Sequence, residues 1–508
     1  MTIKHPWSLA TAITLFTLYL GYKKLTTPPS SLAHLPRADF FAVIRALINE
    51  TPSDQVAKTI TLPAANKADH GLYVRFDNSG WTVRVTSPEA AKKLLLSHDL
   101  FPKARLQKKR EGTIAGRLLV GPNILFETGE KWKEHRKIVN PAFHRSMPVA
   151  LFGRLMQKLL HGELMTPTQA LLNVHTITTR WTLDVIGLSS FDFDFHALDQ
   201  IDNNPWVDRY HYLVAKAKNP LFFLFPILEQ RYLFLFPDRQ KVHNELSIFL
   251  GMMSDIISKK KQLLQEKGVN SNTIADNEKD LLALMIEAEN DGEGRLSNDE
   301  LLSNLCVFFL AGHDTTASAL AYAIYYLAVN PDAQVKARNE ALAVIGNDPT
   351  PSLDQMRSLS YINMVIKETL RLNPPAVSII PRVATRDTEL NGVFIPKGTR
   401  ISLDIIDLQR NPAIWQDPDT FRPERFAPGG EAEQLTRNGM PWAPFSDGAR
   451  KCIGSNFSMM EQRVFLTMLL REYEWSLPED SIHKNGLITQ GLGATQPKDL
   501  FIKFTKRG

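Results

Sequence analysis

The sequence predicts a mainly α-helical protein with small β-sheets. Apolar residues recur at helical spacing through most of the chain from about residue 88 to about residue 370. Before this region, residues 71–76 and 81–86 alternate apolar and polar side chains around an Asn-Ser-Gly turn, which is typical of a β-hairpin. After it, proline and glycine punctuate short apolar runs around residues 378–406, which indicates short strands.

The clearest helical periods predict helices over residues 88–96, 128–140, 150–160, 240–265 and 298–329, and a further helix near 454–472. The polar stretch 266–279 is expected to be a surface loop, and residues 407–450 are expected to be irregular. The sequence contains no repeats, no P-loop and no GxGxxG segment, so it indicates no nucleotide-binding domain.

Composition narrows the class of protein further. The 508 residues are 44% hydrophobic and 22% charged, as in an ordinary globular protein. The two cysteines, Cys306 and Cys452, exclude a disulfide framework and any four-cysteine metal site, and they fit a reducing compartment. A net charge of +5 is small for a nucleic-acid-binding protein, so no nucleic-acid partner is expected.

An uncharged run over residues 7–22 lies close to the N-terminus, and Lys23 and Lys24 follow it. As a helix this run reaches about 24 Å, slightly less than the roughly 30 Å core of a bilayer. We expect a membrane anchor over residues 1–25, a linker over 26–60 and a catalytic domain over 61–508. A cleaved signal peptide and a buried or interfacial helix are the alternatives. The two lysines indicate that the chain after them lies on the cytoplasmic side.

The most informative segment is FSDGARKCIG, residues 445–454. A helical period follows it directly, which places Cys452 at a helix N-terminus, where the helix dipole favours a thiolate. A thiolate is a strong axial ligand for haem iron. A lone cysteine is more often a small buried hydrophobic residue, so the residues around it must decide between the two interpretations.

The spacing F-x-x-G-x-R-x-C-x-G resembles the haem-ligand loop of the cytochrome P-450 superfamily, the haem-thiolate monooxygenases. The resemblance implies that Cys452 is the axial ligand of haem b, and that the cofactor also contacts Phe445, Arg450 and Gly454. Two positions depart from the common pattern. Ser446 stands where the family has glycine, and Ser458 stands where it often has alanine. Neither departure removes a ligand.

Further segments match the family in its order along the chain. Trp132 and Arg136 share one helix face, and the resemblance assigns both, together with Arg382, to the haem propionates. The segments ETLR and FRPERF resemble the family's buried structural triad, which would here consist of Glu368, Arg371 and Arg425. A buried charge network is stable only when every member is paired.

The segment AGHDTT, residues 311–316, lies inside the expected helix 298–329. The resemblance implies that Thr315 hydrogen-bonds the bound dioxygen and that Asp314 relays protons to it. A threonine hydroxyl inside a helix can also bond a backbone carbonyl. Cys306 is expected to be a core residue. His313 is not expected to bind iron, because the thiolate and dioxygen occupy both axial positions.

The resemblance implies the P-450 fold, with haem between a long central helix and the cysteine loop, and a monooxygenase that hydroxylates or epoxidises a lipophilic small molecule. Electrons would come from NADPH through a separate NADPH-cytochrome P-450 reductase, with cytochrome b5 as a second donor. The pattern is similar to fungal, membrane-bound members of the endoplasmic reticulum that tailor terpenoids, polyketides or fatty acids in secondary metabolism. The alternatives are a haem-thiolate isomerase or dehydratase that does not use O2, and a haem sensor. Such isomerases tend to lose the acid–threonine pair, which this chain keeps.

Overall fold

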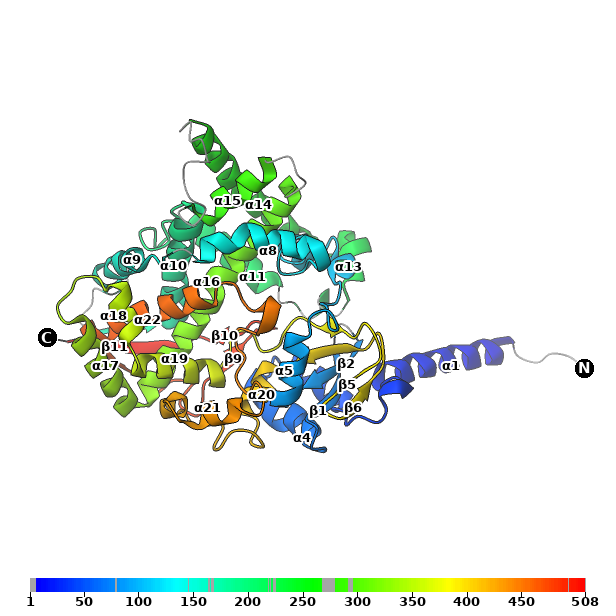
Figure 1. Cartoon of the computed structure of the whole chain (residues 1–508). Helices are drawn as coiled ribbons and strands as arrows, with labels where there is room; N and C mark the ends of the chain where they lie inside the picture. Colours follow the sequence, from blue (N-terminus) through cyan, green and yellow to red (C-terminus); the bar gives the residue numbers. More distant parts are fainter. Residues whose placement is uncertain are drawn as a thin grey trace, which may run out of the picture. The chain divides into compact units, whose positions relative to one another are not determined.

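The computed structural model describes residues 6–77, 80–144, 146–162, 165, 169–217, 219, 221–222, 225–266, 279–290, 296–491 and 493–507 (Figure 1). The chain forms two compact units. Unit 1 consists of Met1–Ala104, Ser378–Pro418 and Leu435–Trp442, and unit 2 consists of Arg105–Val377, Asp419–Gln434 and Ala443–Gly508. The predicted catalytic range 61–508 therefore contributes to both units.

Unit 1 is built on a small sheet with the strand order β1-β2-β7-β4. Its strands are β1 (Leu72–Asp77), β2 (Gly80–Val85), β4 (Arg382–Val383) and β7 (Arg400–Leu403), and a separate antiparallel pair is formed by β5 (Thr388–Leu390) and β6 (Val393–Ile395). Its helices include α2 (Phe40–Ile48), α3 (Ser53–Val56), α4 (Leu62–Ala65), α5 (Pro88–Leu96) and α20 (Ile405–Arg410). The antiparallel pairing of β1 with β2 confirms the predicted hairpin, whose turn residues 78 and 79 lie outside the described residues.

Helix α1 (Pro6–Thr26) contains residues 6–25 of the predicted anchor, and residues 1–5 lie outside the described residues. Among the described residues, no helix combines the length and the apolar character that crossing a bilayer requires. The anchor over residues 1–25 stays a prediction. The range 26–60, predicted as a linker, carries a short helical turn (Ser30–Leu32), α2, α3 and most of a π-helical turn (Ala57–Thr61).

A buried cluster of charged residues joins β1, β2 and α20 in unit 1. The Tyr73 hydroxyl lies 2.7 Å from Asp404 Oδ2 and 3.0 Å from Asp407 Oδ2, and Arg84 donates to Asp404 at 2.6 Å. Burial and the neighbouring Asp404 charge raise the pKa of Asp407 to about 7. Although burial also disfavours the Asp404 carboxylate, Arg75 and Arg84 lower its pKa. Asp407 is therefore the member of the pair that is protonated first as the pH falls.

Replacing Asp407 with asparagine is expected to change how stability depends on pH. The folded protein holds a proton on Asp407 up to about pH 7, whereas the unfolded chain releases it near 3.8. Asp407 therefore contributes stability below about pH 4, and this contribution is lost as the pH rises to about 7. Asp407→Asn mimics the protonated acid, so above pH 7 it should stabilise unit 1 by on the order of 2 kcal/mol.

Chemical denaturation between pH 4 and pH 8 measures this effect. Asp99→Asn is the matched control, because Asp99 lies in the same unit with its side chain 93% exposed. An Asp407→Asn protein that follows the wild-type pH profile would contradict the assignment of this proton.

Unit 2 contains most of the long helices, and α16 (Asn298–Val329) is the longest of those described. The other helices of unit 2 include α6 (Gln107–Arg110), α7 (Ile114–Leu118), α8 (Gly129–His144), α9 (Val149–His161), α10 (Val174–Ile186), α11 (Pro205–Ala217), α13 (Ile227–Arg231), α14 (Pro237–Glu266), α15 (Leu281–Asn290), α17 (Pro331–Ile345), α18 (Leu353–Ser358), α19 (Tyr361–Leu372) and α22 (Ser455–Glu472). Helix α21 (Glu431–Thr436) has its first four residues in unit 2 and its last two in unit 1. Its strands are β3 (Gln169–Asn173), β8 (Tyr473–Ser476), β9 (Thr489–Gln490), β10 (Gln496–Pro497) and β11 (Phe501–Lys506), and β11 pairs antiparallel with both β3 and β8.

Helix α16 begins at a capping box, in which Ser297 and Glu300 satisfy each other's backbone N–H groups. Its residues from Thr316 onward are almost all buried, because the sequence there is apolar around the whole helix. Gly312 lets α16 approach α10 closely, since a Cβ at this position would lie 2.9 Å from Ile186 Cδ1.

The predicted helices are confirmed to within a few residues by α5, α8, α9, α14, α16 and α22. The predicted short strands around 378–406 correspond to β4, β5, β6 and β7. Most of the predicted loop 266–279 lies outside the described residues.

Candidate functional site

The cysteine loop of unit 2 is held by its own backbone. The Cys452 N–H donates to the Phe445 carbonyl at 2.9 Å, and the Ser455 N–H donates to the Cys452 carbonyl at 3.4 Å. Helix α22 begins at Ser455 with Gly454 as its N-cap, so Cys452 lies just before the helix, as the sequence predicts. Cys452 is exposed and is not part of a disulfide.

Ser446 shows why the resembled family has glycine at its position. Its φ angle is 58°, in the left-handed region that a residue with a Cβ adopts only at some cost. Gly448 is also left-handed, with φ 69°, and opens the short 3-10 turn Gly448–Arg450. The loop reaches its shape despite the serine.

Helix α8 brings basic and aromatic side chains to the same loop. The Arg450 guanidinium lies 3.8 Å from the centre of the Trp132 ring, and Arg450 also donates to the Glu127 carbonyl at 2.9 Å. Arg136 donates to the Lys451 carbonyl at 3.2 Å. Burial lowers the pKa of Arg136, and Cys452 is close enough to act in the opposite direction. The structure thus brings Trp132, Arg136, Arg450 and Cys452 together.

Aromatic side chains connect the loop to the central helix. A Cβ added to Gly454 would meet only Phe143 Cε1, at 3.9 Å. Phe143, at the end of α8, lies 5.9 Å from Phe308 of α16 between ring centres. Thr316 of α16 donates to Ser458 of α22 at 2.9 Å, which gives a polar partner to the serine that departs from the family pattern.

The middle of α16 is accessible although the helix is buried on both sides of this stretch. Residues 304–309 and 316–328 are buried, whereas Ala311 is exposed and Asp314 and Thr315 are half-buried. Thr315 Oγ1 donates to the Ala311 carbonyl at 2.8 Å, as expected for a threonine inside a helix. The Asp314 carboxyl and the Thr315 hydroxyl therefore lie next to accessible space.

Tyr210 of α11 is a neighbour of this stretch that the sequence did not indicate. Its ring lies 4.8 Å from the His313 ring, and burial together with the Asp314 charge raises the pKa of its hydroxyl. The His313 ring is buried, its Nδ1 lies 2.5 Å from the Phe309 carbonyl, and burial lowers its pKa. No local motif could predict the contact, because a long stretch of chain separates Tyr210 from His313.

Cys306 is buried in α16, in agreement with its predicted place in the core. Burial raises the pKa of its thiol to about 12, so it stays protonated.

The three residues of the proposed triad are brought together in unit 2. Arg371 donates to both oxygens of Glu368, at 2.7 and 2.9 Å, and Arg425 donates to Glu368 Oε1 at 3.2 Å. All three side chains are fully buried. Arg425 also pairs with Glu431, so the two buried guanidinium groups face two carboxylates.

Arg382 belongs to unit 1, whereas the other predicted haem residues belong to unit 2. It is buried in β4 and donates to the carbonyls of Leu94 and Phe101, both at 3.3 Å. Burial lowers its pKa to about 10. Its role toward a haem propionate stays a prediction.

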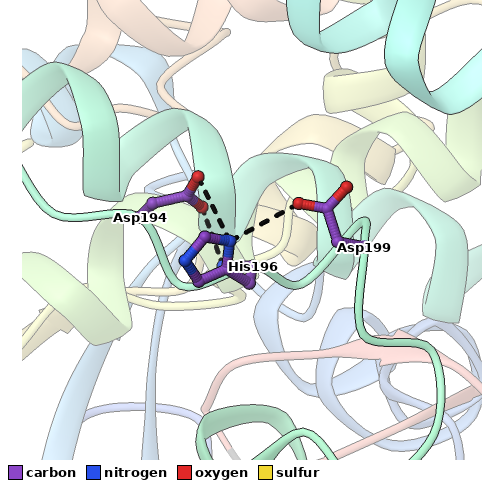
Figure 2. A group of neighbouring side chains, drawn as sticks. All are labelled: Asp194, His196 and Asp199. Carbon is purple, nitrogen blue, oxygen red and sulfur yellow. Dashed lines mark hydrogen bonds and ion pairs between the residues drawn. The ribbon is translucent and has the colours of Figure 1, made fainter.

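Figure 2 shows a second group of titratable residues in unit 2, formed by Asp194, His196 and Asp199. His196 Nδ1 lies 3.4 Å from a carboxylate oxygen of each aspartate. Lys158 pairs with Asp199 at 2.6 Å, so one of the negative charges is already balanced. We interpret the group as a surface ion-pair cluster and assign no ligand to it.

Comparison with known proteins gives matches over most of the chain. The family model described as Cytochrome P450 matches residues 70–504. Cytochrome P450 3A29 of Sus scrofa is 32% identical over 392 residues, which are 74% of each chain. Cytochrome P450 monooxygenase xanG of Aspergillus fumigatus is 27% identical over 461 residues, 88% of this chain and 83% of that protein. The crystal structure of the cytochrome P450DA heme domain superposes with a TM-score of 0.74 at 21% identity, covering 93% of this chain and 98% of that one.

Proposed function

Because this chain belongs to the cytochrome P450 family and is a P450 monooxygenase, we propose that it inserts one atom of O2 into a lipophilic small molecule. Electrons come from NADPH through a separate NADPH-cytochrome P-450 reductase, with cytochrome b5 as a second donor. The observation that carries the proposal is the accessible Cys452 thiol beside Arg136, Arg450 and Trp132.

These side chains fit the haem that the family implies. A thiolate suits the iron, and two guanidinium groups with an indole N–H suit two propionates. Cys452 would hold the iron, and Trp132, Arg136 and Arg450 would hold the propionates, with Arg382 proposed as a further partner. Phe445 and Gly454 are proposed as further haem contacts: the Phe445 carbonyl accepts from the Cys452 N–H, and Gly454 has no side chain. Bound haem supplies a redox-active iron that activates dioxygen.

We assign the delivery of protons to Asp314 and Thr315. Asp314 is half-buried, so its carboxyl can exchange protons with water while the helix on either side of it excludes solvent. Thr315 Oγ1 donates to the Ala311 carbonyl, so its lone pairs stay available to accept a proton or a hydrogen bond. An isomerase or dehydratase that does not use O2 would not need this pair.

Thr315→Ala tests the proposed reaction. In a reconstituted system with the reductase and a turned-over lipophilic substrate, the variant should still consume NADPH and O2. The product formed per NADPH is expected to fall by about tenfold or more, with hydrogen peroxide replacing it, because the hydroxyl no longer positions the proton. Ser318→Ala on the same helix is the matched control, since Ser318 is buried away from the accessible stretch. If Thr315→Ala stays fully coupled, the proposed proton route is wrong.

Apolar surface supports a lipophilic substrate and contact with a membrane. Exposed large hydrophobic residues gather around α13 in unit 2: Leu221, Phe225, Ile227, Tyr232, Phe234 and Leu235. Exposed apolar side chains also cover α1 in unit 1, and Lys23 and Lys24 lie in its last turn. We propose that the protein is attached to the endoplasmic reticulum membrane with its catalytic part in the cytoplasm. The substrate classes that we propose are terpenoids, polyketides and fatty acids of fungal secondary metabolism.

Removal of residues 1–26 tests the attachment. The truncated protein should leave the membrane fraction at least in part, and should retain its haem and its carbon monoxide spectrum, because the described contacts of the cysteine loop lie in unit 2. Fractionation at high salt separates insertion from electrostatic adsorption. Loss of bound haem on truncation would show that α1 does more than attach the protein.

A further inference from the structure

His135 is a buried histidine of α8 that the proposed reaction does not use. Its side chain is fully buried between α8 and the first turns of α16. Its Nδ1 lies 3.3 Å from Asn304 Nδ2, and its Nε2 lies 3.5 Å from Glu300 Oε1. One imidazole therefore faces an amide nitrogen on one side and a carboxylate on the other.

The orientation of the Asn304 amide decides which nitrogen of His135 carries the proton. Asn304 Oδ1 accepts from the Ile124 N–H at 3.0 Å, and Asn304 Nδ2 donates to the Glu300 carbonyl at 2.8 Å. A flipped amide would lose both bonds. The group that faces His135 Nδ1 is therefore an NH2 donor, so Nδ1 must be an acceptor without a proton. The proton of the neutral ring lies on Nε2, toward Glu300.

A charged imidazolium does not fit this pocket. It would carry N–H on both nitrogens, and its Nδ1–H would point at the Asn304 NH2 group, donor against donor. Burial lowers the pKa of His135. The charges of Glu300 and Glu127 act in the opposite direction, whereas the charge of Lys131 lowers this pKa further. Lys131 Nζ lies 3.5 Å from the same Glu300 oxygen, so it partly balances the carboxylate that would favour the imidazolium.

His135 lies between Trp132 and Arg136 on α8, and those two residues meet the cysteine loop through Arg450 and the Lys451 carbonyl. We propose that His135 is a positioning residue that holds α8 against α16 only while its imidazole is neutral, and that its protonation loosens the grip of Trp132 and Arg136 on the haem propionates. The proposal rests on the haem-binding role given to these two residues above.

The direction in which pH changes stability and haem retention follows from the preference of the folded protein for a neutral His135. The folded protein binds this proton less readily than the unfolded chain, in which histidine titrates near 6.5. Stability and haem retention should therefore fall as the pH decreases below about 6.5. Because a single proton is involved, the rate of haem loss should rise by at most about tenfold per pH unit.

The experiment uses the full-length haem-loaded protein between pH 5 and pH 8. Two quantities are measured: the thermal unfolding midpoint, and the rate of haem transfer to apomyoglobin. As the pH falls below about 6.5, the unfolding midpoint of the wild type should decrease and its rate of haem transfer should increase. His135→Gln should flatten both pH dependences, because a glutamine oxygen can accept from Asn304 and does not titrate. His144→Gln, at the exposed end of the same helix, is the matched control and should behave as the wild type.

Asn304→Asp provides a second test if His135→Gln does not fold. A carboxylate at residue 304 accepts from Nδ1–H and so favours the imidazolium, which should make the midpoint rise, relative to the wild type, as the pH falls from 8 to 6. An unchanged acid-side decrease in His135→Gln, or no relative rise in Asn304→Asp, overturns the proposal. If the unfolding midpoint depends on pH but the rate of haem loss does not, His135 does not control how Trp132 and Arg136 hold the haem propionates. If the wild-type protein lacks a thiolate-type carbon monoxide band, the proposed function is wrong instead. The unfolding midpoints alone then test whether neutral His135 stabilises the contact between α8 and α16.

Discussion

Cys452→Ser is expected to abolish the red-shifted Soret band of the reduced carbon monoxide complex and all NADPH-dependent turnover. A serine hydroxyl remains protonated at neutral pH and cannot replace the electron donation of a thiolate. The loop itself should survive, because the bonds that shape it are made by the backbones of Phe445, Cys452 and Ser455. The variant should therefore be folded, with weakly bound haem or none.

The carbon monoxide difference spectrum and a haem assay on the same sample measure this result. Cys306→Ala is the matched control, because Cys306 is the other cysteine and is buried in α16. The control should keep the band and lose only the stability of a small core deletion, roughly 1 kcal/mol. A Cys452→Ser protein with an unchanged spectrum would mean that the iron ligand lies elsewhere.

Glu368→Gln is expected to be the most damaging substitution for the fold. The amide removes the carboxylate that Arg371 and Arg425 share, and their two fully buried guanidinium groups then face one carboxylate, Glu431, in place of two. Breaking a buried ion pair by removal of one partner costs about 3–5 kcal/mol, a large share of the stability of a domain. The variant should give little soluble protein, and the folded fraction should have a strongly lowered unfolding midpoint.

Glu424→Gln gives the comparison in the same region. Glu424 pairs with Lys336 at 3.0 Å, but both side chains are about half exposed, so the loss should be at most about 1 kcal/mol. Soluble yield and the denaturation midpoint are measured for both variants. Equal, small effects would show that the buried network is not essential for the fold.

The features that the sequence predicts well are local. The β1–β2 hairpin follows from alternation over a few residues, and α16 follows from a long helical period of apolar residues. The cysteine loop could be identified because its residues are contiguous and their spacing is specific. The division into two units could not be predicted, because each unit is assembled from segments that lie far apart in the chain.

The same limit applies to the candidate site. Tyr210 and Asn304 are ordinary residues of helical segments, and only the packing of α11 and α8 against α16 makes them neighbours of His313 and His135. Arg382 could be matched to a motif, but the sequence could not show that its described partners are the carbonyls of Leu94 and Phe101 in unit 1.

The close contact of Gly312 with Ile186 limits how this protein can be redesigned. A Cβ at residue 312 would lie only 2.9 Å from two carbons of the isoleucine, so the spacing of the two helices has a steric minimum at this point. Thr315 lies three residues further along the same helix. Ile186 therefore also limits how far the part of α16 that carries Thr315 can move toward α10. Directed evolution toward bulkier substrates would therefore have to enlarge the accessible side of α16, because the side that packs on α10 has no room to retreat.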